Sequence, residues 1–160
     1  MAELNPLDEK LGEVLGLAQA AQDATAKVAK LAERDELVAR LEEMREDAAE
    51  TERRTLQLID GLEGKKTKIQ EKGRETKSEA TAMMQTYLGD DADELDGFEF
   101  LMMAEAGELG HWEIVREMSR TTGEDAALEL ADWAIPIQRR HTEVVRDSAL
   151  ELAAEEAVGA

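Results

Sequence analysis

The sequence predicts an all-helical protein folded as a four-helix bundle. Ala, Glu, Leu, Lys and Arg are abundant, and only 2 of the 160 residues are proline. Apolar residues recur at steps of three and four, and no segment shows the alternating pattern that predicts a strand. A chain of this length fits one domain, so we expect residues 1–160 to form a single unit.

The first two predicted helices are defined by two apolar stripes. The first stripe consists of Leu4, Leu7, Leu11, Val14, Ala18, Ala21, Thr25 and Val28. The second consists of Leu37, Leu41, Met44, Ala48, Thr51, Thr55, Leu58 and Leu62. The second stripe starts two residues out of phase with the first, a rotation of about 200° on a helix of 100° per residue. We therefore expect a tight turn near residues 33–35 between two antiparallel helices.

A long connection separates the first helix pair from the second. Gly61 and Gly64 end the second helix, and a polar tract with few apolar residues follows. We expect a partly helical crossover over about residues 63–95, with Asp93 or Asp96 capping the next helix. A long connection between two short turns is typical of a four-helix bundle whose second and third helices are parallel.

The second helix pair occupies the C-terminal part of the chain. The third helix is expected at about residues 97–120, and a turn at "TTGED" leads to a fourth that ends near residue 157. Pro136 removes a backbone donor inside the fourth helix, so we expect a kink or a break between 126–134 and 137–156. The fourth helix carries two apolar stripes, which predict either a dimer seam or packing on several neighbours.

Charge and composition restrict the possible partners. The chain has 38 acidic and 19 basic residues, and its net charge of −19 would repel nucleic acid and anionic membranes. Cysteine is absent, and no apolar run approaches the ~20 residues that span a bilayer, so we expect a cytoplasmic protein without disulfides. A halophilic source is one hypothesis for the acidic excess, and an ordinary acidic helical protein is the other.

Two carboxylates and a histidine follow one another at single-turn spacing on the third predicted helix: Glu105, Glu108 and His111. The second histidine of the chain, His141, has Gln138 at the position that a glutamate takes in a Glu-x-x-His pair. Such a pair projects both side chains inward from successive turns, and iron, manganese and zinc accept carboxylate oxygens and imidazoles. The five residues are therefore candidate ligands of Fe, Mn or Zn.

This constellation and the stretch "HWEI" at residues 111–114 resemble the ferritin-like superfamily, in particular its YciF-type proteins. The resemblance covers about residues 37–152 and is concentrated on the third helix. It implies a four-helix bundle with metal ions in its interior, a homodimer, and a role in stress responses.

The ligand set of that superfamily is incomplete in this chain. The inward positions of the first two helices are Ala21, Ala48 and Thr51, none of which is a strong ligand. Four carboxylates lie nearby in the sequence: Asp23, Glu46, Asp47 and Glu50. They could replace the missing ligands only if the helix phase were shifted by about a third of a turn. A di-iron site needs about six protein ligands with bridging carboxylates. Enzymatic activity is therefore not the expected function.

Three functions stay open on the sequence alone. One is a ferritin-like bundle with a partial or degenerate metal site, in which Glu108, His111 and His141 hold a single ion and Glu105 or water completes its shell. Another is a non-enzymatic structural or interaction bundle, in which buried carboxylates and imidazoles satisfy one another without an ion. The third is a di-iron oxidase or peroxide-handling enzyme, which would require carboxylates from the first two helices.

Overall fold

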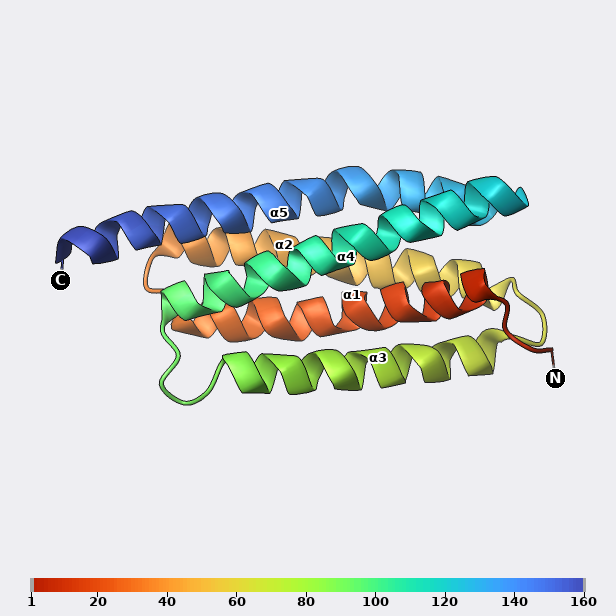
Figure 1. Cartoon of the computed structure of the whole chain (residues 1–160), viewed down its shortest axis with the longest axis horizontal. Helices are drawn as coiled ribbons and strands as arrows, with labels where there is room; N and C mark the ends of the chain where they lie inside the picture. The colour runs from red at the N-terminus through yellow and green to blue at the C-terminus, as the bar shows by residue number, and fades with distance from the viewer. Residues whose placement is uncertain (1, 160) are drawn as a thin grey trace.

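The structure, a computed structural model, describes residues 2–159 and consists of five α-helices, with no strand among these residues. The helices are α1 (Pro6–Leu31), α2 (Asp35–Asp60), α3 (Lys66–Tyr87), α4 (Glu94–Thr122) and α5 (Asp125–Gly159) (Figure 1). The prediction of an all-helical chain is confirmed. Within the described part of the chain, no helix combines the length and the apolar character needed to cross a membrane.

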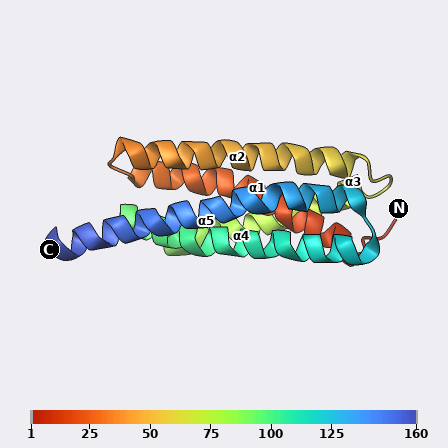
Figure 2. The ribbon, with the colours of Figure 1, turned by 90° about the horizontal axis from the view of Figure 1, so that it is seen from above.

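The long helices form two antiparallel hairpins, α1 with α2 and α4 with α5 (Figure 1, Figure 2). The hairpins pack on each other, because α1 contacts α4 and α2 contacts α5. α2 and α4 run in the same direction (Figure 1). α3 runs in the opposite direction and carries the chain from the end of α2 back to the start of α4. The turn between α1 and α2 occupies residues 32–34, close to its expected place.

Capping side chains determine where two of the helices begin. The Asn5 side chain accepts a hydrogen bond of 2.8 Å from the backbone N–H of Asp8, and the Asp8 carboxylate accepts one of 2.9 Å from the N–H of Asn5. Asp93 and Asp96 form the same reciprocal pair at the start of α4. This capping box lets α4 begin at Glu94, three residues earlier than expected from the apolar pattern.

α5 continues through Pro136 without interruption, so the expected division into two segments is not observed. Pro136 is exposed, and water can therefore bond the carbonyl of Asp132 that lacks its usual donor. The apolar face of α5 is wide because the helix contacts both α4 and α2. Ala131 and Ile135 from one of its two apolar stripes and Leu130 and Ala134 from the other are all buried within the chain.

Most of the expected crossover is the helix α3, which packs on α1 through glycine residues. A Cβ atom on Gly12 would lie 2.7 Å from Cβ of Lys72, and one on Gly73 would lie 3.2 Å from the carbonyl oxygen of Gly12. A Cβ atom on Gly16 would collide with the backbone of Gly73. The backbones of α1 and α3 therefore approach more closely than residues with side chains would allow.

The interior contains two apolar clusters with a polar layer between them. On α4 the clusters occupy positions within residues 98–101 and 112–115, and on α5 they occupy positions within 127–135 and 145–152. Between these segments both helices carry buried polar side chains. Four of the five candidate metal ligands belong to this layer, which lies near the middle of the two hairpins.

Candidate functional site

Polar side chains from three helices meet in the polar layer. Glu105 on α4 and Gln138 and His141 on α5 are each no more than 5 % exposed. α2 contributes Asp47, whose side chain is 25 % exposed. Glu105 faces α5 from one side of His141, and Asp47 faces it from the other.

Gln138 holds the carboxylate of Glu105 in place. Its amide Nε2 donates a hydrogen bond to the Glu105 carboxylate and lies 3.2 Å from the Glu105 carbonyl oxygen, to which it also donates. An amide nitrogen is a donor only, and the amide carries no charge. Residue 138 thus supplies a neutral donor to Glu105 at the position where a Glu-x-x-His pair would supply a negative metal ligand.

His141 lies between two carboxylates. Its Nε2 is hydrogen-bonded to Oδ2 of Asp47 at 2.8 Å, and its Nδ1 lies 3.8 Å from Oε2 of Glu105. Burial acts to lower the pKa of His141, but the hydrogen bonds and charges of Glu105 and Asp47 outweigh burial and raise this pKa above its usual value. The two carboxylates therefore favour the protonated imidazolium, with an N–H on both ring nitrogens, more than bulk water does.

Glu108 is buried without a partner. Its side chain is 5 % exposed, and within residues 2–159 no hydrogen bond or ion pair reaches its carboxyl group. Burial, and secondarily the charge of Glu105, raise the pKa of Glu108 well above its usual value. A carboxyl group in this position either keeps its proton or requires a cation beside it.

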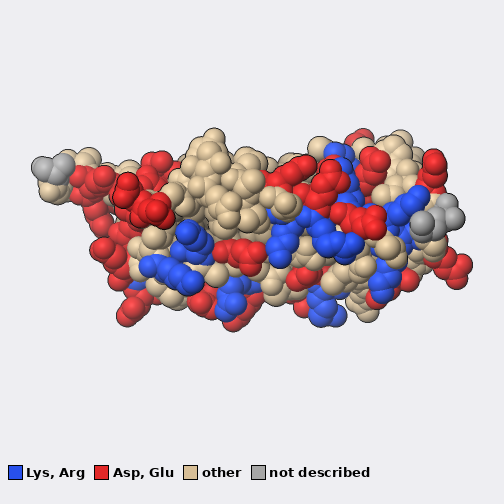
Figure 3. Space-filling model, turned by 90° about the horizontal axis from the view of Figure 1, so that it is seen from below, with Lys and Arg blue, Asp and Glu red and all other residues tan. Residues whose placement is uncertain are grey.

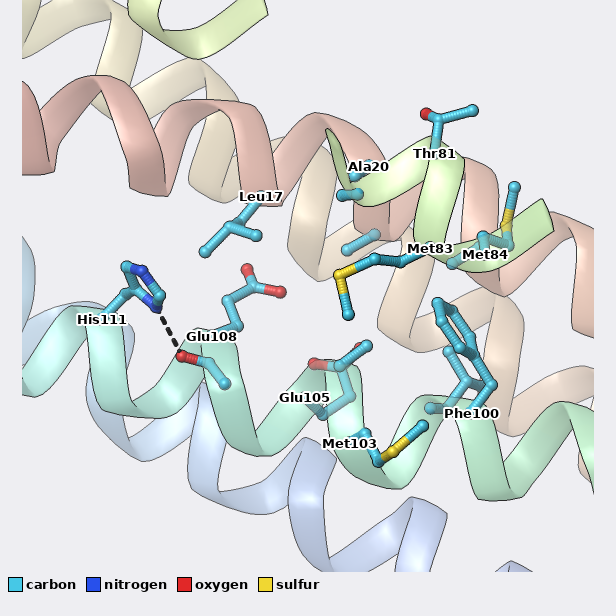
Figure 4. Close-up of a pocket in the computed structure, with 16 residues that line it drawn as sticks. Leu17, Ala20, Thr81, Met83, Met84, Phe100, Met103, Glu105, Glu108 and His111 are labelled. Carbon is cyan, nitrogen blue, oxygen red and sulfur yellow. Dashed lines mark hydrogen bonds between the residues drawn. The ribbon is translucent and has the colours of Figure 1, made fainter. Parts of the chain in front are cut away.

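His111 lies apart from the other candidate ligands. Its side chain is 36 % exposed, and its Nδ1 is 2.8 Å from the carbonyl oxygen of Gly107 (Figure 4). Its Nε2 is 3.4 Å from Oε2 of Glu13 on α1. The interactions of His111 are thus with its own helix and with α1. Those of His141 are with α4 and α2.

A cavity of about 240 Å³ adjoins the polar layer between α1, α3 and α4 (Figure 4). Most of its wall consists of Ala, Leu and Met side chains, with Leu17 on α1, Met83 on α3 and Met103 on α4 around the space. Glu108 contributes its carboxyl group to this wall, and His111 lies at one end of the cavity. The unpaired carboxyl group therefore faces an apolar space.

The five residues predicted as metal ligands do not form one cluster. Glu105, Gln138 and His141 are together, Glu108 faces the cavity, and His111 is at the surface. Among residues 2–159, no group of three or more His, Asp or Glu side chains is arranged to hold a metal ion. The interaction that the polar layer supports directly is pairing of the His141 imidazole with the carboxylates of Asp47 and Glu105 on either side of it.

Two residues of the site were not among the predicted ligands. Asp47 is three residues after Met44 and four before Thr51, which places it at the edge of the apolar stripe of α2 rather than outside it. That spacing is a signal from which its approach to His141 can be inferred. Glu13, the neighbour of His111, has no comparable signal, because it depends on how α1 and α4 pack.

The comparisons with known proteins assign the chain to no family. No protein family matches it, and no curated protein does either.

Proposed function

We propose that this protein is a ferritin-like four-helix bundle with a degenerate metal site that serves as a non-enzymatic structural or interaction protein. Two antiparallel hairpins, parallel α2 and α4, and a crossover that contains α3 support the ferritin-like interpretation. The polar layer lies inside the bundle, in the region where the ferritin-like resemblance implies metal ions.

The observation that carries the proposal is the pairing of His141. An imidazole binds a metal ion through a nitrogen that carries no proton. Asp47 and Glu105 favour the protonated ring from opposite sides, and the Glu105 carboxylate is in turn bonded by Gln138. A metal ion bound to His141 would have to displace these hydrogen bonds and charge pairs. A structural role requires no change in them.

The ligand set also argues against a di-iron enzyme. The buried positions of α2 next to the polar layer are Ala48, Thr51 and Thr55, and the hydroxyl groups of both threonines donate to carbonyls of their own helix. Asp47, the carboxylate that α2 does supply, is engaged by His141 and by Arg140. A pair of iron ions needs several bridging carboxylates, which this arrangement does not provide.

One observation favours a second candidate function, the binding of a single metal ion. Glu105 and Glu108 are buried neighbours of like charge, and Glu108 lacks a partner. A divalent ion such as Mn²⁺ between them would offset the repulsion and would leave His141 as the available nitrogen ligand. His111 lies outside this second arrangement.

Metal analysis distinguishes the two functions. We expect the purified protein to contain well below one Fe, Mn or Zn ion per chain, and calorimetric titration with Mn²⁺ or Zn²⁺ to show no saturable site. His141→Gln should lower the free energy of unfolding by about 3 kcal/mol, because Glu105 and Asp47 lose their buried partner. One bound ion per chain that disappears in Glu105→Gln but persists in the control His111→Gln would establish the metal-binding function instead.

A further inference from the structure

The cavity beside the polar layer contains acidic groups but no basic counterpart apart from a histidine at its end. Its polar side chains are those of Glu105, Glu108, Thr81 and His111, and none of the lining residues is Lys or Arg. Glu105 is already bonded by Gln138, so the carboxyl group of Glu108 is the acceptor that remains available. The electrostatic character of the cavity therefore favours a cation over an anion.

The size and the wall of the cavity favour an organic molecule. An apolar cavity of ~150 Å³ is large enough to hold benzene. The volume of about 240 Å³ found here has room for an aromatic ring with a short substituent. Methionine side chains can adjust to the shape of a ligand, and Met83, Met84 and Met103 all line the space. A bare metal ion would find few oxygen ligands in this wall.

The cavity lies beside a part of the surface from which such a molecule can enter. The cavity-lining residues Met83 and Met103 are 55 % and 47 % exposed. Figure 3 shows a tan area without charged side chains on the face where α3 and α4 lie. The net charge of −19 raises the local concentration of cations around the whole molecule.

We propose that this cavity binds a small organic amine, with its ammonium group on the Glu108 carboxylate and its apolar body against Leu17, Met83 and Met103. This inference rests on the non-enzymatic interaction role proposed above and specifies the class of ligand. An ammonium group supplies the charge-assisted hydrogen bond that Glu108 lacks within the protein. A neutral apolar ligand would leave that group unpaired, and an anion would be repelled by Glu105 and Glu108.

Benzylamine is a suitable probe, and benzyl alcohol is its neutral counterpart of nearly the same size. We expect calorimetric titration of the full-length protein to show one saturable site for benzylamine. Its dissociation constant should be at least about tenfold lower than that of benzyl alcohol, because the alcohol cannot form the charge-assisted contact. Benzoate, which carries the opposite charge, should not bind.

Three variants locate the site. Glu108→Gln keeps the shape of the side chain and should weaken benzylamine binding about tenfold or more, to the level of benzyl alcohol. Glu99→Gln is the matched control: it removes the same charge from an exposed position of α4 outside the cavity and should change binding less than about twofold. Gly107→Leu should weaken binding of both probes, because it adds an apolar side chain at an exposed position that lines the cavity. Gly107 lines the cavity, and a Cβ atom there meets nothing within 4 Å, so this variant should fold normally.

The following results would overturn the inference: benzyl alcohol binding as tightly as benzylamine, Glu108→Gln and Glu99→Gln having equal effects, or no saturable binding of benzylamine. Circular dichroism of each variant shows whether the fold is retained. Failure of the amine proposal is separate from failure of the proposed function, because the latter is decided by metal content and by its dependence on Glu105.

Discussion

The protonation of Glu108 is coupled to folding. Its pKa is raised from 4.5 by burial and by the neighbouring Glu105, so the folded chain retains a proton that the unfolded chain releases. Because the folded state then binds more protons, the free energy of unfolding decreases as pH rises above about 4.5. The decrease continues until the pH passes the raised pKa of the folded state.

Glu108→Gln should remove this dependence on pH. At pH 4.5 the variant and the wild type should differ little in stability, because Glu108 is protonated in the folded wild type and about half protonated in the unfolded chain. At pH 8 the variant should be the more stable protein, because the folded wild type then buries an unfavourable carboxylate charge that the neutral amide of Gln does not carry. Urea denaturation of both proteins between pH 4.5 and 8 measures the difference. A difference that stays constant with pH would show that Glu108 titrates normally in the folded protein.

The positions of the candidate ligands show what the spacing of residues can and cannot predict. Each step of three residues on an α-helix rotates the side chain by 300°, which is 60° short of a full turn. Two steps place His111 about 120° away from Glu105, so the two side chains leave the helix toward different neighbours. Gln138 and His141 are a single step apart, and both face Glu105. Spacing therefore identified the polar layer, and it did not predict the surface position of His111.

At the scale of helices, the contact between α1 and α3 depends on glycine rather than on an apolar stripe. The buried residues of α3 are Ile69 and Gly73, which is too few for a recognisable apolar periodicity. The four long helices could be predicted because each carries such a stripe, whereas the exact limits of α3 could not. The capping box of α4 and the continuity of α5 through Pro136 depend on local hydrogen bonding and exposure, which the apolar pattern does not report.

Gly16→Ala should destabilise the protein although alanine is the better helix former. The substitution gains about 1 kcal/mol of helix propensity. Against this, the added methyl group collides with the backbone of Gly73, and such overpacking costs about 1–3 kcal/mol. We expect a net loss of up to about 2 kcal/mol in the free energy of unfolding, measured by urea denaturation.

Gly110→Ala provides the control for this substitution. A Cβ atom on Gly110 meets nothing within 4 Å, so the propensity gain of up to about 1 kcal/mol should appear as added stability. A stabilising Gly16→Ala of the same size would show that α3 moves away from α1 at little cost. In that case the close contact between the two backbones would not contribute to stability.

For the whole molecule, charge is distributed unevenly over the helices. α3 carries more Lys and Arg than Asp and Glu, although the chain as a whole has 38 acidic and 19 basic residues. Ion pairs connect the segment around α3 to its neighbours, from Lys65 to Asp8 at 2.7 Å and from Lys77 to Asp23 at 3.7 Å. The homodimer that the ferritin-like resemblance implies stays a prediction. The apolar stripes of α5 do not by themselves require a partner, because both contribute buried residues to the interior of the chain.

Salt acts on these charges in two opposing ways. It weakens the ion pairs that attach α3, and it weakens the repulsion among the excess carboxylates. Exposed ion pairs contribute at most about 1 kcal/mol each to stability. The repulsion that arises from the net charge of −19 is a sum over all the acidic residues at the surface. The reduction of repulsion should therefore be the larger effect.

We accordingly expect the midpoint of thermal unfolding to rise by several degrees between about 0.1 M and about 1 M KCl, as the Debye length falls from about 10 to about 3 Å. Circular dichroism at the helix minimum measures the midpoint. Lys77→Ala serves as a control, because loss of its ion pair with Asp23 should change stability little at either salt concentration. A midpoint that falls with added KCl would mean that the ion pairs around α3 outweigh the repulsion. The halophilic interpretation of the acidic excess would then lose its physical basis.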